Sequence, residues 1–429
     1  MRWTNTNLIE HDISVIKYTD VFVPGGFPHH TYNPRETLDL EARLNEITEN
    51  LCKLVTVTGH TKSGKTVLVR KVLPTDKAIW VDGGAVGEAD EFWEIILDKL
   101  EGHQEITTDT SKGTESEISA KGSAGANFIV AKGESEIGAA RKFSRGESTA
   151  TTRSTSARVA ALRALAISDA ALVIDDFHYL PKALQGGVVR ALKPLIFDGL
   201  PVVVIAIPHR RFDAVKVEKE MTGRILPISI PTWSIDELSY IPNTGFPLLE
   251  LELSESMSSS LADEAIGSPH LMQEFCRAVA RSSQSDNSSI TLTEEEMESI
   301  FSTVAETIGR PIFEKLARGP RQRTDRLPRE LTNGQSVDIY ELVLYGLAQL
   351  KPGLSTYEYE DLRAGIREVS AGQIPQLQEV ARVLKHMATI ASTDQSSTPV
   401  IDFEENDKRL HVTDPFFAFF LRRGNLNRS

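Results

Sequence analysis

The chain has 429 residues, of which 40% are hydrophobic and 25% charged; this length allows two or three globular domains, and this composition disfavours a wholly disordered or fibrous protein. The formal net charge of −13 argues against nucleic-acid binding through a generally basic surface, so any contact with DNA has to be local. The two cysteines, Cys52 and Cys276, are too few for a disulfide scaffold, and we expect both to be reduced and structural.

Residues 1–50 are expected to form an N-terminal arm and the first helix of a core domain. The first residues, MRWTNTNLIEHDISV, include acidic side chains and lack a continuous apolar stretch, so they are unlike a secretory signal. No window of the sequence approaches the ~20 apolar residues that a membrane-spanning helix requires. We therefore expect a cytoplasmic protein that does not insert into a membrane.

Residues 51–235 are predicted to form an α/β domain. Short apolar runs rich in β-branched residues alternate here with amphipathic stretches, which is typical of βαβ units that build a parallel sheet covered by helices. Flanking Gly, Pro or Asp residues favour buried strands over short helices. Five strands are predicted: KLVTVTG, AIWVDGG, ALVIDDF, PVVVIAI and ILPISIP.

The first predicted strand is followed by GHTKSGKT, which fits the P-loop pattern G-x-x-x-x-G-K-[ST] at every fixed position and precedes a predicted helix. The glycines let backbone N–H groups turn toward phosphates, Lys65 supplies a cation for the β- and γ-phosphates, and Thr66 offers a hydroxyl to Mg²⁺. We therefore predict ATP and Mg²⁺ as cofactors. The predicted nucleotide-binding residues are Gly59, His60, Thr61, Lys62, Ser63, Gly64, Lys65 and Thr66.

Residues 102–156 interrupt the alternating pattern of the core. They are dense in Ser, Thr, Gly, Lys and Glu, and their one compact apolar cluster is NFIVA at residues 127–131. Two interpretations stay open: a flexible, solvated insertion, or a long β-hairpin that reaches a protein partner, since Thr- and Ser-rich stretches also suit strands.

The third predicted strand, ALVIDDF, ends in two carboxylates. In this arrangement the first acid orders Mg²⁺ and the second polarises the attacking water, so Asp175 is the predicted metal ligand beside Thr66 and Asp176 the predicted catalytic base. The alternative is that Asp176 merely caps the following turn. Two adjacent acids at the end of a strand favour a cation nearby, because they would otherwise be costly neighbours.

Residues 236–302 are predicted to form a small helical lid domain. Met272, Phe275, Ala278 and Val279 fall at core spacing after the turn Gly267-Ser268-Pro269. Thr293 is a plausible N-cap for the helix that starts in TLTEEEMESIF.

Residues 303–429 are predicted to form a C-terminal winged-helix domain. Three helices are expected at 338–350, 356–369 and 376–390, followed by two short strands around an acidic turn in PVIDFEENDKRLHV. The terminal cluster PFFAFF, with Phe416, Phe417, Phe419 and Phe420, is expected to close the core of this domain.

Five segments in this order, GHTKSGKT, VIDDFHYL, VVVIAIPHR, EMTGRI and GSPHLMQEFCR, resemble the AAA+ ATPases related to origin-recognition and transposition-associated proteins. The resemblance covers roughly residues 21–280. It implies a five-stranded P-loop core and a ring- or filament-forming ATPase that is a homo-oligomer in its ATP state. It also implies that an arm like VFVPGGFPHHTYNPR holds the adenine and ribose, which makes Phe27 and Tyr32 candidates for walling the base. The alternative is an arm that packs on the core.

Three further site residues follow from the same resemblance. His209 falls at the position of the γ-phosphate sensor, Arg224 at the arginine finger that acts on a neighbouring subunit, and His270 at the lid residue that touches the phosphates. Arg210 and Arg211 compete with Arg224 for the finger role. The two histidines depart from the usual Asn and Arg, and a largely neutral imidazole stabilises phosphate charge less well, so hydrolysis is expected to be slow.

A local excess of positive charge spans Arg310 to Arg329. Beside a winged helix it favours phosphate-backbone contacts with DNA, but the expected recognition helix offers few basic side chains, Arg382, Lys385 and His386 among them, and the wing is acidic. Protein contact or intramolecular docking is the alternative. We expect an ATPase that couples nucleotide state to self-assembly and to a DNA or protein partner. The rivals are a DNA-binding regulator in which ATP is a ligand switch, and the ATPase subunit of a prokaryotic defence or mobile-element system.

Overall fold

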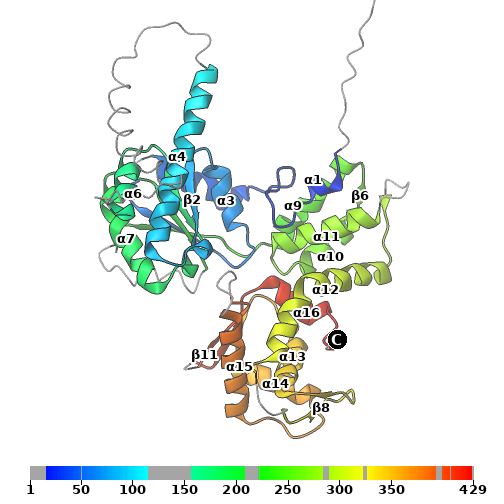
Figure 1. Cartoon of the computed structure of the whole chain (residues 1–429). Coiled ribbons are helices and arrows are strands. Elements are labelled where there is room, and N and C mark those ends of the chain that lie inside the picture. The colour runs from blue at the N-terminus through cyan, green and yellow to red at the C-terminus, as the bar shows by residue number, and fades with distance from the viewer. Residues whose placement is uncertain are drawn as a thin grey trace, which may run out of the picture.

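The computed structural model describes residues 16–49, 51–114, 156–207, 221, 223–283, 289–321, 326–392, 399–405 and 407–427. Figure 1 shows these residues in three groups: a sheet with its flanking helices, a group of helices around α11, and a C-terminal group from α12 to α16. No helix in these ranges combines the length and the apolar character needed to span a membrane.

The first group contains a five-stranded sheet that confirms the five predicted strands. All its strands are parallel and follow the order β2-β3-β4-β1-β5. Most strand residues are buried because helices cover both faces, which explains the nearly continuous apolar runs in the sequence. The strands are β1 (Leu54–Thr58), β2 (Ala78–Asp82), β3 (Ala171–Asp175), β4 (Val202–Ala206) and β5 (Ile225–Ser229).

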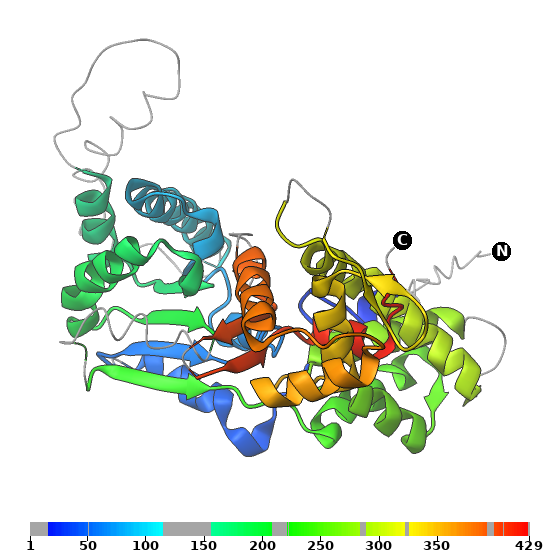
Figure 2. The same cartoon turned by 90° about the horizontal axis from the view of Figure 1, so that it is seen from below.

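Helices pack on both faces of this sheet, as Figure 2 shows. One face carries α4 (Ala89–Thr114), α6 (Ala157–Ala166) and α7 (Lys182–Phe197), and the other carries α2 (Leu40–Asn45) and α3 (Lys65–Val72). Because α4 continues to Thr114, the predicted insertion at 102–156 begins inside a helix. Residues 115–155, on which the choice between loop and hairpin depends, lie outside the described residues.

The second group consists of α1 (Tyr18–Val21), α9 (Ile235–Gly245), α10 (Glu255–Glu264), α11 (Pro269–Ser282) and the short strands β6 (Glu252–Leu253) and β7 (Ser289–Ile290). The predicted core spacing in α11 is confirmed, since Met272, Phe275 and Val279 are fully buried and Ala278 is partly buried. Cys276 lies between them and is buried, as expected for a structural thiol. We refer to α9, α10 and α11 as the lid.

A single long helix, α12 (Glu294–Arg318), joins the lid to the C-terminal group. Its start confirms the predicted N-cap, because the Thr293 hydroxyl accepts from the Glu296 N–H and the Glu296 carboxylate accepts from the Thr293 N–H. The expected domain boundary between residues 302 and 303 falls inside this helix. The buried side chains of α12 extend from Phe301 to Ala317 and so lie on both sides of this boundary.

The C-terminal group contains the three predicted helices, and its strands include the two expected around the acidic turn. Residues 356–369 differ from the prediction of one helix, because Thr356–Glu358 form a strand that pairs with the strand before the terminal cluster. This pairing gives a three-stranded antiparallel sheet in the order β10-β12-β11. The elements are β8 (Arg329–Glu330), β9 (Ser336–Val337), α13 (Ile339–Gln349), β10 (Thr356–Glu358), α14 (Tyr359–Val369), α15 (Leu377–Ser392), β11 (Ile401–Glu404), β12 (Arg409–Val412) and α16 (Pro415–Arg423).

The terminal aromatic cluster joins the lid and the C-terminal group into one apolar core. In α16, Phe417, Phe419 and Phe420 are fully buried, and the ring of Phe419 lies 5.0 Å from that of Phe275 in the lid. The cluster therefore closes the C-terminal core as predicted, and it also extends that core into the lid.

Candidate functional site

The segment Gly59–Thr66 connects the carboxyl end of β1 to the start of α3. Lys62 and Gly64 adopt left-handed backbone conformations, with φ values of 59° and 90°, and Gly64 is the N-cap of α3. Left-handed residues in a turn direct backbone N–H groups into one concave surface, and the N-terminus of α3 adds its partial positive charge. This geometry forms an anion-binding cradle of the kind that phosphates occupy.

Lys65 is the buried cation of this cradle. Its ammonium donates to the carbonyl oxygens of Gly59 at 3.0 Å and of His60 at 2.8 Å, and the residue is only 7% exposed. Burial lowers the pKa of Lys65 to about 8, against the opposing attraction of Asp176 and Asp175. A polyphosphate would offer this ammonium charged acceptors in place of neutral carbonyls, and such hydrogen bonds are stronger.

Three carboxylates, those of Asp82, Asp175 and Asp176, lie at the carboxyl edge of the sheet beside the cradle. Asp175 ends β3, and its side chain accepts from the hydroxyl of Thr66 at 3.3 Å and from the N–H of Asp176 at 3.0 Å. Asp82, which sequence analysis missed, ends β2 in register with Asp175. The sequence does indicate this residue, because the apolar run AIWVD ends in an acid, as the run ALVIDD does.

The backbone around Asp176 is tightly constrained. Asp176 has a left-handed φ of 48°, and a Cβ atom on Gly83 would lie 2.5 Å from its carbonyl oxygen. The chain therefore needs glycine at position 83 for the turn after β2 to pass so close to the acid pair.

Burial shifts both acids in the same direction. Burial, and then the neighbouring Asp175 carboxylate, raise the pKa of Asp176 to about 6. Burial also raises the pKa of Asp175, although the hydrogen bond from Thr66 opposes this shift. At neutral pH Asp176 is therefore mostly ionised, but it holds its charge in a place that lacks full hydration, and a divalent cation would relieve that cost.

The residues around Thr66 fit Mg²⁺. Among the described residues no cluster of three or more His, Cys, Asp or Glu side chains could hold a metal ion. Mg²⁺ does not need one, because it is commonly bound through one or two protein oxygens, several waters and the phosphates of the substrate. The hydroxyl of Thr66 and the carboxylate of Asp175 supply such oxygens side by side.

A cavity of about 330 Å³ extends from the cradle to the N-terminal arm. Within the described chain, the buried hydroxyls of Thr61 and Ser63 have no hydrogen-bond partner, so the loop still has polar groups to offer a ligand. Tyr32 lines this cavity as predicted, whereas Phe27 is not among the lining residues and stacks on Tyr32 with ring centroids 6.2 Å apart.

The structure places two of the three residues suggested by the resemblance. His270 lies in the first turn of α11 and lines the cavity, with its ring edge-on to Phe416 at 4.8 Å. Arg224 is exposed, and its carbonyl accepts from the Leu54 N–H at the amino ends of β1 and β5. Arg224 thus lies at the edge of the sheet opposite its own P-loop. His209, with Arg210 and Arg211, lies outside the described residues.

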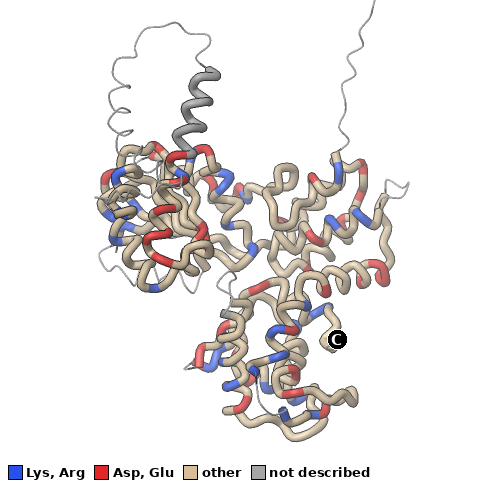
Figure 3. The backbone as a smooth tube through the Cα atoms, in the orientation of Figure 1, with Lys and Arg blue, Asp and Glu red and all other residues tan. Residues whose placement is uncertain are grey.

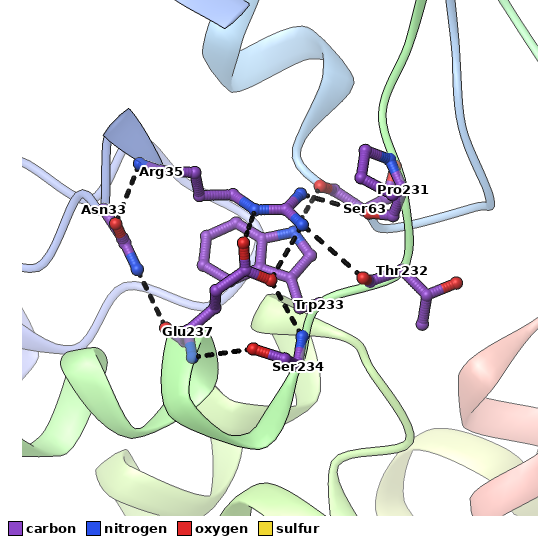
Figure 4. A network of polar contacts seen from close by, with 8 residues as sticks. All are labelled: Asn33, Arg35, Ser63, Pro231, Thr232, Trp233, Ser234 and Glu237. Atoms are coloured by element: carbon purple, nitrogen blue, oxygen red, sulfur yellow. Dashed lines mark hydrogen bonds and ion pairs between the residues drawn. The ribbon is translucent and has the colours of Figure 1, made fainter. Parts of the chain in front are cut away.

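A polar network that sequence analysis missed joins the arm, the P-loop and the lid (Figure 4). The guanidinium of Arg35 lies over the indole of Trp233, 4.7 Å from the ring centroid, and forms a two-point ion pair with Glu237 at 2.8 Å for both contacts. The indole N–H donates to the carbonyl of Ser63 in the P-loop at 3.0 Å. Ser63 belongs to the P-loop and Glu237 to a capping box with Ser234, but the contacts of Arg35 and Trp233 with them join residues far apart in the sequence.

The P-loop also contacts the C-terminal group. The ammonium of Lys62 lies 2.5 Å from a carboxylate oxygen of Asp414 and 3.6 Å from the ring centroid of Phe416. Asp414 is nearly fully buried, and its other oxygen accepts from the N–H groups of Phe416 and Phe417 at the start of α16. The predicted nucleotide-binding residue Lys62 is thus anchored by the last helix.

Three arginines of the basic stretch from Arg310 to Arg329 form ion pairs within the protein. Arg310 contacts Glu306 and Glu314, Arg326 contacts Asp338 at 2.5 Å, and Arg329 contacts Glu379 at 3.4 Å. Figure 3 shows Lys and Arg of this group lying among Asp and Glu. Arg318 and Arg321 are exposed, whereas Arg323 lies outside the described residues. Arg310, Arg326 and Arg329 are thus engaged in contacts within the chain.

The expected recognition helix corresponds to α15, and two of its three basic side chains have partners in the fold. Lys385 forms an ion pair with Glu405 of the acidic turn at 2.8 Å, and a ring nitrogen of His386 lies 2.7 Å from the hydroxyl of Tyr340. Arg382 is exposed.

Neither a protein-family model nor a curated protein sequence matches the chain. Among solved structures it is similar to the Walker-type ATPase PABY2304 of Pyrococcus abyssi, with a TM-score of 0.53 and 16% identity, covering 91% of this chain and 95% of that one. Lower TM-scores are found for the ORC2 protein of Aeropyrum pernix (0.48, 13% identity, 94% and 95% covered) and for Cdc6p of Pyrobaculum aerophilum (0.42, 13% identity, 94% and 96% covered). Together with the strand order, the first likeness shows that the chain shares the fold of this Walker-type ATPase, a five-stranded parallel sheet with a P-loop after β1.

Proposed function

We propose that the protein binds and hydrolyses ATP and that its nucleotide state controls self-assembly and contact with a DNA or protein partner. The observation that carries the proposal is the position of Lys65 and Thr66 at the start of α3, beside Asp175 and Asp176 at the end of β3. A phosphate-binding cradle next to two half-buried acids combines the parts that phosphoryl transfer needs.

Each residue has a distinct role in this proposal. The loop from Gly59 to Gly64 and the ammonium of Lys65 bind the β- and γ-phosphates, and Thr66 and Asp175 hold Mg²⁺. When bound, Mg²⁺ neutralises charge on the phosphate oxygens. Asp176 accepts a proton from the attacking water and orients it, which its ionised state at neutral pH allows. His209 senses the γ-phosphate and His270 contacts the phosphates from the lid.

Replacement of Asp176 by asparagine should separate ATP binding from hydrolysis. Asn keeps the size of the side chain but accepts no proton, so turnover should fall by about 10²- to 10⁴-fold while ATP still binds. In the unmodified protein, kcat/KM should fall as the pH drops through about 6, since this ratio reports groups of the free enzyme. Phosphate-release assays across pH measure both effects.

The melting temperature provides a control for this variant. Because the folded protein raises the pKa of Asp176, the contribution of this group to stability is greatest below its unfolded value and is lost as the pH rises through about 6. Asp176→Asn should therefore melt no lower than the unmodified protein at pH 8. Asp169→Asn, at the opposite edge of the sheet, should leave turnover unchanged. An unchanged rate in Asp176→Asn would assign this acid to capping the turn.

The domain organisation that we propose follows the chain: an arm at 1–50, an ATPase core at 51–235, a lid at 236–302 and a winged-helix domain at 303–429. The winged-helix assignment is supported by the order of α13, β10, α14, α15, β11 and β12. We further propose that Arg224 acts on the nucleotide of a neighbouring subunit. The insertion at 102–156 is our candidate for a protein contact.

DNA binding through the basic stretch should depend steeply on salt. Each phosphate neutralised contributes about −0.9 to the slope of log affinity against log salt concentration, so replacing exposed Arg318 and Arg321 by alanine should reduce the slope by about 2. Replacing Arg323 as well should flatten it further. Fluorescence anisotropy with single- and double-stranded DNA, with ATP present, measures the effect. An absence of binding at low salt would exclude a DNA partner and favour a protein one.

A regulator in which ATP acts mainly as a ligand, or the ATPase subunit of a prokaryotic defence or mobile-element system, is the alternative that we retain. The acid pair favours hydrolysis, because a site that only binds nucleotide has no need of a second, half-buried carboxylate. If the protein is such a regulator, Asp176→Asn should have the same affinity for ATP as the unmodified protein, and the same affinity for DNA.

A further inference from the structure

Two consecutive carbonyl groups of the P-loop are hydrogen-bonded from outside the sheet core. The indole N–H of Trp233 donates to the carbonyl of Ser63 at 3.0 Å, and the hydroxyl of Ser268 donates to that of Lys62 at 3.4 Å. Trp233 lies in the linker between β5 and α9, and Ser268 is the N-cap of α11. The lid side of the protein thus contacts the loop where it turns into α3.

The hydrogen bond from Trp233 fixes the orientation of one peptide group. In a trans peptide the C=O and the following N–H point in opposite directions. With the Ser63 carbonyl directed at the indole, the N–H of Gly64 points away from it. Gly64 is the N-cap of α3, where backbone N–H groups bind phosphates. Gly64 has a φ of 90° and no Cβ atom to restrain this peptide sterically, so an external partner such as the indole can help to fix its orientation.

Arg35 and Glu237 in turn hold the indole. Arg35 is 5% exposed, and besides Glu237 its guanidinium donates to the carbonyl of Pro231 at 3.1 Å. Although burial acts in the opposite sense, the hydrogen bonds from Arg35 and Ser234 keep the pKa of Glu237 below its usual value. The backbone N–H of Trp233 also donates to the carbonyl oxygen of Gly267, between α10 and α11 of the lid, at 3.4 Å. Figure 4 shows the planar guanidinium covering the indole face.

We propose that Trp233 is a positioning residue for the phosphate chain of the nucleotide and that Arg35 and Glu237 hold it in place. The ligand class is the phosphate chain and not the base, because the contact orients a backbone group of the P-loop. This inference rests on the proposed nucleotide binding. It adds that the loop binds nucleotide at full affinity only while the arm and the lid hold the indole against it.

The test compares two Trp→Phe variants that lose the same type of hydrogen bond. Trp80, on β2, also donates its indole N–H to a carbonyl, that of Leu73, at 3.0 Å, and it also carries an arginine, Arg70, 5.2 Å from its ring centroid. Trp233→Phe should weaken ATP and ADP binding by about 3- to 10-fold, the loss expected for one hydrogen bond. Both variants should melt at a lower temperature than the unmodified protein, because each loses one hydrogen bond. Trp80→Phe should nevertheless bind both nucleotides like the unmodified protein.

Steady-state kinetics adds a reading that a purely structural role would not change. The Gly64 N–H contacts the phosphates before and during phosphoryl transfer, so Trp233→Phe should raise KM for ATP about 3- to 10-fold and change kcat less than about twofold. Glu237→Gln is the second variant. It keeps the capping contact with Ser234 but weakens the hold on Arg35, and it should weaken ATP binding about 2- to 5-fold.

Each outcome decides between distinct conclusions. If the unmodified protein fails to bind ATP in calorimetry, the proposed function and this inference both fall. If it binds ATP but Trp233→Phe binds equally well, or Trp80→Phe is weakened to the same extent, the positioning role is wrong and the ATPase proposal stands. Weakening confined to Trp233→Phe and Glu237→Gln supports the role.

Discussion

Replacement of Lys65 by alanine is expected to abolish hydrolysis and to weaken ATP binding by at least about 10-fold and up to about 150-fold. A hydrogen bond to a charged group contributes about 1.5–3 kcal/mol, and Lys65 is the buried cation positioned to form such bonds with the phosphates. In the structure its ammonium already donates hydrogen bonds to carbonyl oxygens of the loop. Replacing these acceptors by phosphate oxygens therefore requires no large movement of the backbone. Titration with a fluorescent ATP analogue measures the loss.

A matched lysine distinguishes this effect from a general change in charge. Lys77 is exposed in the turn before β2, at the edge of the sheet away from the cradle, and Lys77→Ala should bind ATP normally. Both variants should melt close to the unmodified protein. Unchanged affinity in a folded Lys65→Ala would rule out nucleotide binding at this loop.

Replacement of Arg224 by alanine should lower hydrolysis by roughly 10³-fold, the lower end of the range for arginine fingers, while ATP affinity of the monomer stays nearly intact. The position of Arg224 supports action between subunits. Five residues of β1, about 16 Å at the rise of a strand, separate its edge of the sheet from the P-loop of the same chain. Its guanidinium lies 5.4 Å from the ring of Phe197, which is 62% exposed.

Mixing experiments test the neighbouring-subunit role directly. When inactive Lys65→Ala and inactive Arg224→Ala subunits are mixed in equal amounts, about a quarter of the interfaces should pair an intact loop with an intact arginine and recover activity. Turnover per subunit in the unmodified protein should rise with concentration. Arg163→Ala, on the outer helix α6, is the control and should stay active. An absence of rescue, with activity independent of concentration, would mean that Arg224 acts only in packing.

The sheet and the cradle could be predicted because their determinants are local. Four of the five strands are runs of five mostly buried residues that stand out as apolar stretches, and the P-loop pattern follows β1 directly. The N-cap at Thr293 was equally accessible, since its capping box spans four consecutive residues. A structural feature can be predicted from the sequence when the residues that determine it lie in one short segment.

The contacts that link the parts of the molecule could not be predicted in this way. The Arg35–Glu237 pair joins residues 202 positions apart, and the capping box that contains Glu237 gives no sign of Arg35 as a partner. Residues 356–358 were assigned to a helix because the strand depends on pairing with β12, about fifty residues later. The boundary at 302/303 was placed in a continuous helix because the lid and the C-terminal group share one apolar core, which shows only when both are packed.

The pairing of Lys62 with Asp414 has a consequence for how the protein is made. The two residues are 352 positions apart, so at about 5–20 residues per second the P-loop is synthesised roughly 18 to 70 s before its partner. Throughout that interval the nascent loop lacks one of its anchors, and it reaches its final set of contacts only after α16 has docked. The phosphate-binding loop therefore reaches its final structure late in the folding of the chain, although its residues are synthesised early.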